Sequence, residues 1–357
     1  MRIVANRWAW AVVAVAAVMW WPVWSQPSHV AVGGTAGRVI ATNGSPFYRN
    51  SFTVGGDVSL YWQQCDSSRY WVRWWGYPYI GLRANYAHVW NSVAGDRLGV
   101  AGLMQHPLVG RLDLAYSVGL SFYTNPYSLS GDVSNIWIGS VVNCLIDFGL
   151  VYNLPLSGRS TAYLAGKVVH SSNGYLYKPN RGLNFLQIEA GVRYGQPRRG
   201  ERSMRMLRDA TFESSGHPFV MVSPGAVMSR YDPLDKITYY PTYTVQLGYA
   251  KRVHPCFAYG ASLDLSYNFS HRGIAPADEW PVYPALSLFV DNCYGPLVLR
   301  VGVAHYLAYY PLNWEQYYER LGLYYRIGAS RRQMVGVGMK VHYDHIDFVE
   351  WSYIVEL

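Results

Sequence analysis

The chain has 357 residues, of which 50% are hydrophobic and 15% are charged, with a formal net charge of +8. A typical soluble domain has about 25% charged residues, and the 32 tyrosines and 14 tryptophans of this chain are unusually many. Beyond the N-terminus no segment is apolar enough for a membrane-spanning helix, so the composition argues against a helical membrane protein.

The N-terminus has the layout of a secretory signal peptide over residues 1–26. Arg2 and Arg7 precede an apolar run from Trp8 to Trp21. This run is shorter than the about 20 apolar residues that a membrane-spanning helix needs. A retained N-terminal anchor is the alternative. A secreted chain seldom meets nucleic acid, and its Lys and Arg residues are spread over strand ends and turns. We therefore expect anionic lipid headgroups, and no nucleic acid, as partners of the basic charge.

From residue 79 onward, apolar and polar residues alternate in segments of roughly ten residues separated by turns. Such alternation predicts strands with one apolar and one polar face. Strands of this length cross a bilayer when tilted, and because every backbone group in lipid must be paired, their sheet must close. The clearest segments are residues 111–124, 161–172, 184–196, 242–250, 256–270 and 297–307.

The pattern therefore predicts an all-β protein, a transmembrane antiparallel β-barrel of about 14 strands within a range of about 12 to 16, over residues 79–357. For residues 27–78 the sequence allows two interpretations, an extra hairpin of the barrel or a periplasmic segment. Short connections alternate with longer ones, which places the C-terminus in the periplasm. The exception is the long, arginine-rich link 196–215, which we interpret as a solvated excursion. A large soluble β-sandwich is the alternative to the whole interpretation.

The four cysteines, Cys65, Cys144, Cys256 and Cys293, are an even number in a chain expected to reach an oxidising compartment. Their spacings match no metal site. We expect no metal and no cofactor, and the sequence alone assigns no disulfide.

One hairpin gathers polar residues on the face expected to meet lipid. In the strand 161–172, Lys167 belongs to the polar lumen, which directs His170 and Ser172 outward, and Asn184 on the next strand has the same outward parity. Residues at positions i and i+2 of a strand lie on the same face, with their Cα atoms about 7 Å apart. A base that takes the hydroxyl proton would turn Ser172 into a nucleophile. Ser and His near each other at a strand end are more often structural, so spacing alone leaves both interpretations open.

The same hairpin resembles the signature of the outer-membrane lipid A 3-O-deacylase family, also called acyloxyacyl hydrolases. The family pattern reads H-x-S-N followed by P-N-x-G, and the matching residues are His170, Ser172, Asn173, Pro179, Asn180 and Gly182. The C-terminal run GMKVHYDHIDFVEW, residues 338–351, resembles longer, Bacteroidetes-type members of this family.

This resemblance implies an outer-membrane barrel of a Gram-negative bacterium that hydrolyses an acyl ester of lipid A, the lipid part of lipopolysaccharide. Ser172 would be the nucleophile and His170 the general base. The family has a Glu two residues after the glycine of its motif, where this chain has Asn184. An amide can orient the imidazole but cannot neutralise the imidazolium. Glu189 is a second candidate for the third position, ranked lower because its parity places it in the lumen.

Two further groups of residues have a functional and a structural interpretation. Lys178 and Arg181, beside the hairpin motif, would bind lipid A phosphates or be ordinary loop charges. Lys340, His342 and Glu350 face the lumen and are interpreted as a structural network of ion pairs. Because the third catalytic position holds an amide, a non-catalytic barrel of the same fold, structural or channel-type, is the alternative function.

Overall fold

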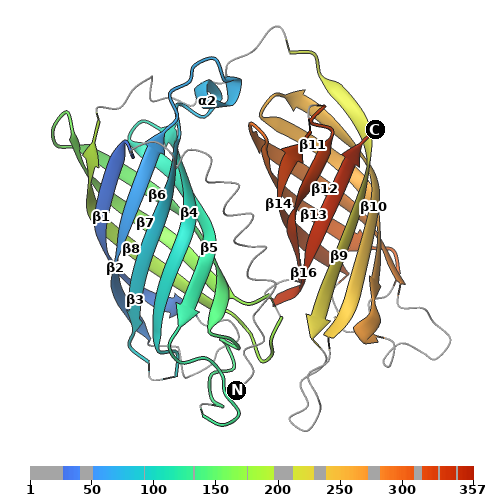
Figure 1. Ribbon diagram of the computed structural model, residues 1–357, viewed down its shortest axis with the longest axis horizontal. Helices are drawn as coiled ribbons and strands as arrows, with labels where there is room; N and C mark the ends of the chain where they lie inside the picture. Colours follow the sequence, from blue (N-terminus) through green and yellow to red (C-terminus); the bar gives the residue numbers. More distant parts are fainter. Residues whose placement is uncertain are drawn as a thin grey trace. The chain divides into compact units, whose positions relative to one another are not determined.

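The structure is a computed structural model that describes residues 27–40, 51–91, 93–131, 133–174, 176–196, 212–228, 239–271, 282–308, 316–328, 330–342 and 345–357. The expected signal peptide, residues 1–26, lies outside these residues. Within the described ranges, no helix combines the length and the apolar character needed to cross a membrane. The described residues form sixteen strands, which close as two separate barrels (Figure 1).

The first barrel contains strands β1 to β8, and each strand is antiparallel to its neighbours. The closing pair is β1 with β8, in a register that runs from His29 opposite Gly195 to Ile40 opposite Asn184. A short helix, α2 (Tyr70–Trp74), lies between β2 and β3. The strands are β1 (His29–Ile40), β2 (Phe52–Gln63), β3 (Tyr79–Val89), β4 (Asp96–Val109), β5 (Leu112–Tyr123), β6 (Val142–Pro155), β7 (Ser160–Ser172) and β8 (Leu183–Gly195).

The second barrel contains strands β9 to β16 and closes by pairing β16 with β9, where Val349 lies opposite Ala226 and Glu356 opposite Phe219. A one-turn 3-10 helix, η2 (Phe269–His271), follows β11. The strands are β9 (Ser215–Met228), β10 (Tyr239–His254), β11 (Phe257–Asn268), β12 (Val282–Tyr294), β13 (Leu297–Tyr306), β14 (Tyr317–Ile327), β15 (Gln333–His342) and β16 (His345–Glu356).

The antiparallel all-β barrel fold is confirmed, and sixteen strands lie within the expected range. The predicted closure is wrong. The strands form two barrels of eight strands each, and not the single barrel expected over residues 79–357. Residues 27–78 supply β1 and β2, which are integral strands of the first barrel. The link 196–215 connects the two barrels, although most of it lies outside the described residues. Alternation and turns indicate which consecutive strands pair, but closing pairs join residues far apart in sequence.

Each barrel has an end with short turns, called here the short-turn end. In the first barrel it carries the β4–β5 turn at 110–111 and the β6–β7 turn at 156–159, and in the second the β10–β11 turn at 255–256 and the β12–β13 turn at 295–296. The opposite end, called here the loop end, carries the connection 173–182 of the first barrel. Since both barrels have an even number of strands, each begins and ends at its own short-turn end.

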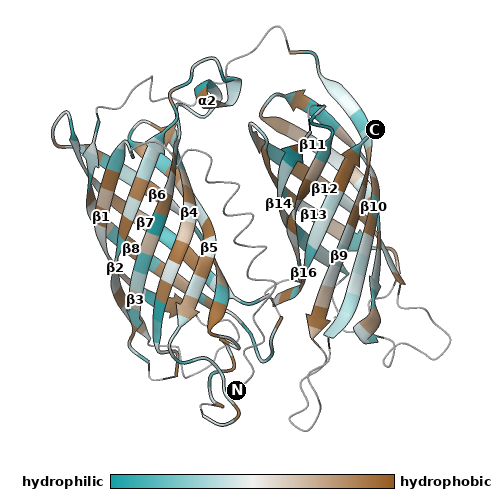
Figure 2. Cartoon of the chain, in the orientation of Figure 1, coloured by the Kyte–Doolittle hydropathy of each residue, from teal (hydrophilic) through white to brown (hydrophobic). Residues whose placement is uncertain are grey.

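Side chains alternate between the outside and the lumen along most of the strands. On β7, Leu164 and Val168 are exposed, whereas Tyr163 and Lys167 are buried. The same alternation holds for β12, whose Leu286 and Leu288 are exposed. Figure 2 shows apolar residues distributed along the strands of both barrels. An apolar outer face with a polar interior is the arrangement that a membrane-spanning barrel requires.

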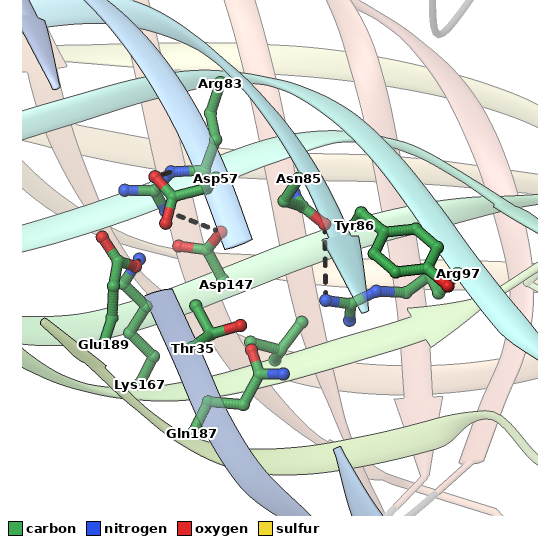
Figure 3. Close-up of a pocket in the computed structure, with 11 residues that line it drawn as sticks. Thr35, Asp57, Arg83, Asn85, Tyr86, Arg97, Asp147, Lys167, Gln187 and Glu189 are labelled. Atoms are coloured by element: carbon green, nitrogen blue, oxygen red, sulfur yellow. Dashed lines mark hydrogen bonds and ion pairs between the residues drawn. The ribbon is translucent and has the colours of Figure 1, made fainter. Parts of the chain in front are cut away.

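The lumen of the first barrel is filled by paired charges (Figure 3). Arg83 contacts Asp147 at 3.4 Å and Asp57 at 3.7 Å, and Lys167 pairs with Glu189. The polar cavity among these side chains measures about 20 Å³, which is room for about one water molecule. An eight-stranded barrel is only wide enough for side chains to fill its interior, so this lumen is a packed core and not a pore.

The second lumen contains the predicted network of Lys340, His342 and Glu350, all of which are buried. Their partners differ from the expected pairing with one another. Glu350 pairs with Arg320 on β14, whereas Lys340 Nζ lies 3.8 Å from an oxygen of Asp347, and His342 Nε2 lies 3.0 Å from the hydroxyl of Tyr306. Parity identifies the face of a strand but not the neighbour across the lumen, which is why Arg320 and Tyr306 were not predicted. Asp347 was not predicted because it lies on the adjacent strand at a register shift, where alternation fails.

The pair Lys167–Glu189 provides a test of the filled lumen. We expect Glu189→Gln to lower the free energy of unfolding by about 3 kcal/mol, because it leaves the Lys167 ammonium buried without its counter-charge. Urea unfolding of the protein in lipid vesicles, followed by tryptophan fluorescence, measures the change. The double variant Lys167→Met, Glu189→Leu removes both charges and should retain more stability than the single variant. Equal stability of the two variants would contradict a buried ion pair.

Candidate active site

The connection 173–182 at the loop end of the first barrel is held by backbone bonds to the β5–β6 connection. The amide of Arg181 donates to the carbonyl of Ile136 at 3.2 Å, and the amide of Gly182 donates to that of Trp137 at 2.9 Å. Trp137 is buried in an apolar cluster with Leu183 and other lumen residues of this end. Apolar packing inside the barrel therefore fixes the height at which the connection re-enters β8.

His170 and Asn184 face each other across the β7–β8 pair. Nδ1 of His170 lies 2.7 Å from Oδ1 of Asn184. Because a carbonyl oxygen can only accept, Nδ1 carries the proton and donates it to this bond. In the neutral imidazole, Nε2 is then the acceptor nitrogen. This is the tautomer that a general base acting on a neighbouring hydroxyl requires.

Ser172 ends β7 and is only 2% exposed. Its Oγ accepts a hydrogen bond from Nδ2 of Asn180 at 2.7 Å. Oδ1 of Asn180 accepts in turn from the backbone amide of Asn173 at 3.4 Å, and Nδ2 of Asn173 donates to Oγ of Ser140 at 3.0 Å. This series of bonds uses a lone pair of the Ser172 oxygen and not its proton, so it orients the hydroxyl without removing its ability to donate.

Gly182 lies beside both the imidazole and the serine side chain. Its φ is +75°, a conformation that favours glycine. A Cβ at this position would lie 2.8 Å from Cε1 of His170 and 3.4 Å from Cβ of Ser172. The ring edge and the serine side chain therefore flank a single point beside the Gly182 backbone. The glycine of the motif is needed both for its backbone angle and for the space it leaves.

His170 and Asn184 share the outward parity of the exposed Val168 and Leu186. The site consequently lies on the outside of the barrel at its loop end. Ser172 has the same parity but is buried, since it stands where the strand meets the connection 173–182.

The other residues of the motif and its surroundings occupy the same connection. Pro179 and Lys178 are half-buried within it, and Arg181 is exposed. Glu189 is buried in the lumen and pairs with Lys167, so it faces away from His170. The second cluster, Lys340, His342 and Glu350, belongs to the other barrel. In the part of the chain that the structure describes, no group of His, Cys, Asp or Glu side chains is arranged to hold a metal ion.

Three neighbours of the site were not identified from the sequence. Cys144 lies opposite Ser172, and Ile146 opposite His170, in the register of β6 with β7. The predicted pairing of these consecutive strands could have indicated both. Ser140, the partner of Asn173, lies in an irregular connection, where no periodic pattern signals a contact.

Two family models match the chain. The model described as lipid A 3-O-deacylase (PagL) matches residues 56–193, and that described as acyloxyacyl hydrolase, C-terminal domain, matches residues 217–354. The first match falls within the first barrel and the second within the second. No curated protein matches the chain.

Two of the solved structures with similarity to the chain illustrate how distant these similarities are. The outer-membrane enzyme PagL is 16% identical, with 45% of this chain and 97% of that chain covered and a TM-score of 0.34. A triple mutant of the Rhodopseudomonas blastica porin is 11% identical, with 92% and 99% covered and a TM-score of 0.19. At these scores the family assignment depends on the two family models alone.

Gly182→Ala tests the packing of the site. We expect at least about a tenfold slower reaction of Ser172 with a fluorophosphonate probe, because an alanine at positive φ costs about 1 to 2 kcal/mol and its Cβ displaces the imidazole. Labelling of the folded protein, read by mass spectrometry, gives the rate. Gly110→Ala is the matched control, since Gly110 also has a positive φ but a Cβ there would meet no atom within 4 Å. Equal labelling of both variants would show that Gly182 has no particular role.

Proposed function

Because the chain belongs to the lipid A 3-O-deacylase family of outer-membrane β-barrels, we propose that its first barrel is an ester hydrolase that removes an acyl chain from lipid A. The observation that supports this most directly is the 2.7 Å bond between His170 Nδ1 and Asn184 Oδ1, beside Ser172. It gives the imidazole the tautomer of a general base, on the outer face of the barrel. No cofactor or metal takes part in the proposed reaction.

The proposed reaction is acyl transfer in two steps. Nε2 of His170 takes the proton of the Ser172 hydroxyl while Oγ attacks the ester carbonyl. The tetrahedral intermediate collapses, the sugar oxygen leaves, and it receives the proton from Nε2. A water molecule, deprotonated by the same nitrogen, then attacks the acyl-enzyme, releases the fatty acid and restores the serine. Asn180, which donates to Oγ, acts as a positioning residue for the nucleophile.

Asn184 takes the third position of the triad. Its carbonyl orients the ring, but it provides no charge to stabilise the imidazolium formed during attack. In a serine protease, the change from acid to amide at this position costs roughly 10⁴-fold in rate. We therefore expect this chain to be a slow enzyme compared with a relative that has a carboxylate there.

The location of the site suits a lipid substrate. Exposed apolar residues such as Val168 and Leu186 lie on the same face and would contact the acyl chains in hydrocarbon. Arg181 is exposed at the loop end, and Lys178 lies in the same connection. A guanidinium and an ammonium there would bind the phosphates of lipid A in the outer leaflet.

A non-catalytic barrel is the second candidate. It is favoured by the 2% exposure of Ser172, because an ester can reach Oγ only if the atoms that cover it move, and by the amide at position 184. A channel is less well supported, since charged side chains fill the first lumen.

Replacing the nucleophile separates catalysis from a structural role. Lipid A extracted from cells that express the wild type should have lost an acyl chain relative to cells with an empty vector. Ser172→Ala should give the pattern of the empty vector, because no nucleophile remains. Mass spectrometry of lipid A measures the acyl-chain number.

The matched control for this experiment is Ser171→Ala. Ser171 is the adjacent serine, is buried on the lumen side and bonds to Ser121. It should retain the wild-type pattern. If Ser172→Ala is folded and its lipid A is identical to that of the wild type, Ser172 is not the nucleophile.

Changing the third member tests its role. We expect Asn184→Glu to raise the deacylation rate by at least about tenfold, because a carboxylate stabilises the imidazolium. Asn184→Leu should lower it at least about tenfold, because the ring loses the acceptor that fixes its tautomer. Release of fatty acid from purified lipid A in vesicles gives both rates.

Ser130→Glu adds the same charge at an exposed position of the β5–β6 connection and should leave the rate unchanged. An Asn184→Leu protein with the full wild-type rate would exclude a role for the amide in orienting His170.

A further inference from the structure

Two cysteines of the second barrel lie side by side at its short-turn end. Cys256 occupies the β10–β11 turn, and Cys293 is the second-last residue of β12. The register of β11 with β12 places Phe257 opposite Asn292, so the next two opposed residues are Cys256 and Cys293. The backbone amide of Cys293 donates to the carbonyl of Cys256 at 2.8 Å, which continues the ladder to this pair.

The geometry of this pair suits a covalent bond. Directly opposed residues of an antiparallel pair have Cα atoms about 4.5 to 5.5 Å apart, within the range of about 4.4 to 6.8 Å that a disulfide spans. Side chains of opposed residues point to the same face. Here that face is the lumen, because both cysteines share the parity of the buried Ala258 and Asp291. Both thiols are buried, at 1% and 3% exposure.

We propose that Cys256 and Cys293 form a disulfide that joins the β10–β11 turn to the end of β12. Each thiol loses a proton, a bond forms between the two sulfur atoms, and the two electrons pass to a disulfide-bearing oxidant, which is reduced to two thiols. Export into an oxidising compartment supplies this oxidant. The proposal depends on that export and is independent of hydrolysis at Ser172.

The surroundings of the pair determine when the bond can form. Burial, with a smaller contribution from neighbouring Cys293, raises the pKa of the Cys256 thiol to about 12. A buried thiol that stays protonated at neutral pH is a poor nucleophile for exchange. We therefore expect the bond to form before the second barrel closes, and to be shielded from external reductants in the closed barrel.

The two other cysteines have different surroundings and are expected to remain thiols. Cys144 lies on β6 of the first barrel, opposite Leu120 on one side and Ser172 on the other. Cys65 is exposed after β2, and its sulfur lies 3.6 Å from the carbonyl oxygen of Gln63.

Counting thiols tests the proposal. The full chain, exported and purified without reductant, is denatured and alkylated with a maleimide, and its mass is measured intact. We expect two labels without reductant and four after reduction, with a linked peptide pair containing Cys256 and Cys293. Four labels without reductant, or a linkage that involves Cys65 or Cys144, would overturn the proposal.

Single variants give the matched comparison. Cys256→Ser should show three labels under both conditions, whereas Cys65→Ser should show one label without reductant and three with it. Peptide mapping of the wild type decides the question if Cys256→Ser does not fold. Ser172→Ala should show the same label numbers as the wild type, so a failure of the proposed hydrolase and a failure of the disulfide are distinguishable.

Discussion

The pairing of every backbone group is the constraint on which the rest of the structure depends. In hydrocarbon an unpaired amide or carbonyl costs several kcal/mol, so a spanning sheet must close on itself. Both barrels close with eight strands, by the pairs β1–β8 and β9–β16. Eight strands leave an interior only as wide as the side chains that fill it. One face of each strand must then suit lipid, and the other must fill a narrow lumen.

The narrow lumen determines where chemistry can occur. Lys167 and Glu189 pair inside the first barrel, with Arg83 and its two aspartates beside them, and little space remains. The alternation that directs Lys167 and Glu189 inward directs His170 and Asn184 outward. A lipid ester can therefore meet the hairpin only from the membrane side. β15 is the seventh strand of the second barrel, as β7 is of the first. Its histidine, His342, points into the lumen beside Tyr306, whereas His170 of β7 points outward.

Local patterns predicted most of the strands, because alternation reflects the two faces of a strand. The segment expected over residues 256–270 is β11, and the parities expected for His170 and Glu189 are those of the structure. The division into two barrels was missed, since the pairing of Ile40 with Asn184 leaves no local signal. The partner of Lys340 was missed for a different reason, because Asp347 on the adjacent strand β16 lies at a register shift beside Lys340, where simple alternation fails. Ser140 belongs to an irregular connection, where each contact is particular to the fold.

The amide at position 184 is understandable from the position of the site. A carboxylate on the outer face must be desolvated next to lipid, where an ionised group is costly. An amide accepts the same hydrogen bond from His170 at a smaller desolvation cost, but it gives up the charge that would stabilise an imidazolium. Near the headgroups a carboxylate is tolerated, and deeper in the hydrocarbon the amide becomes the less costly choice. An amide at position 184 is therefore the expected third member for a site that lies below the headgroups.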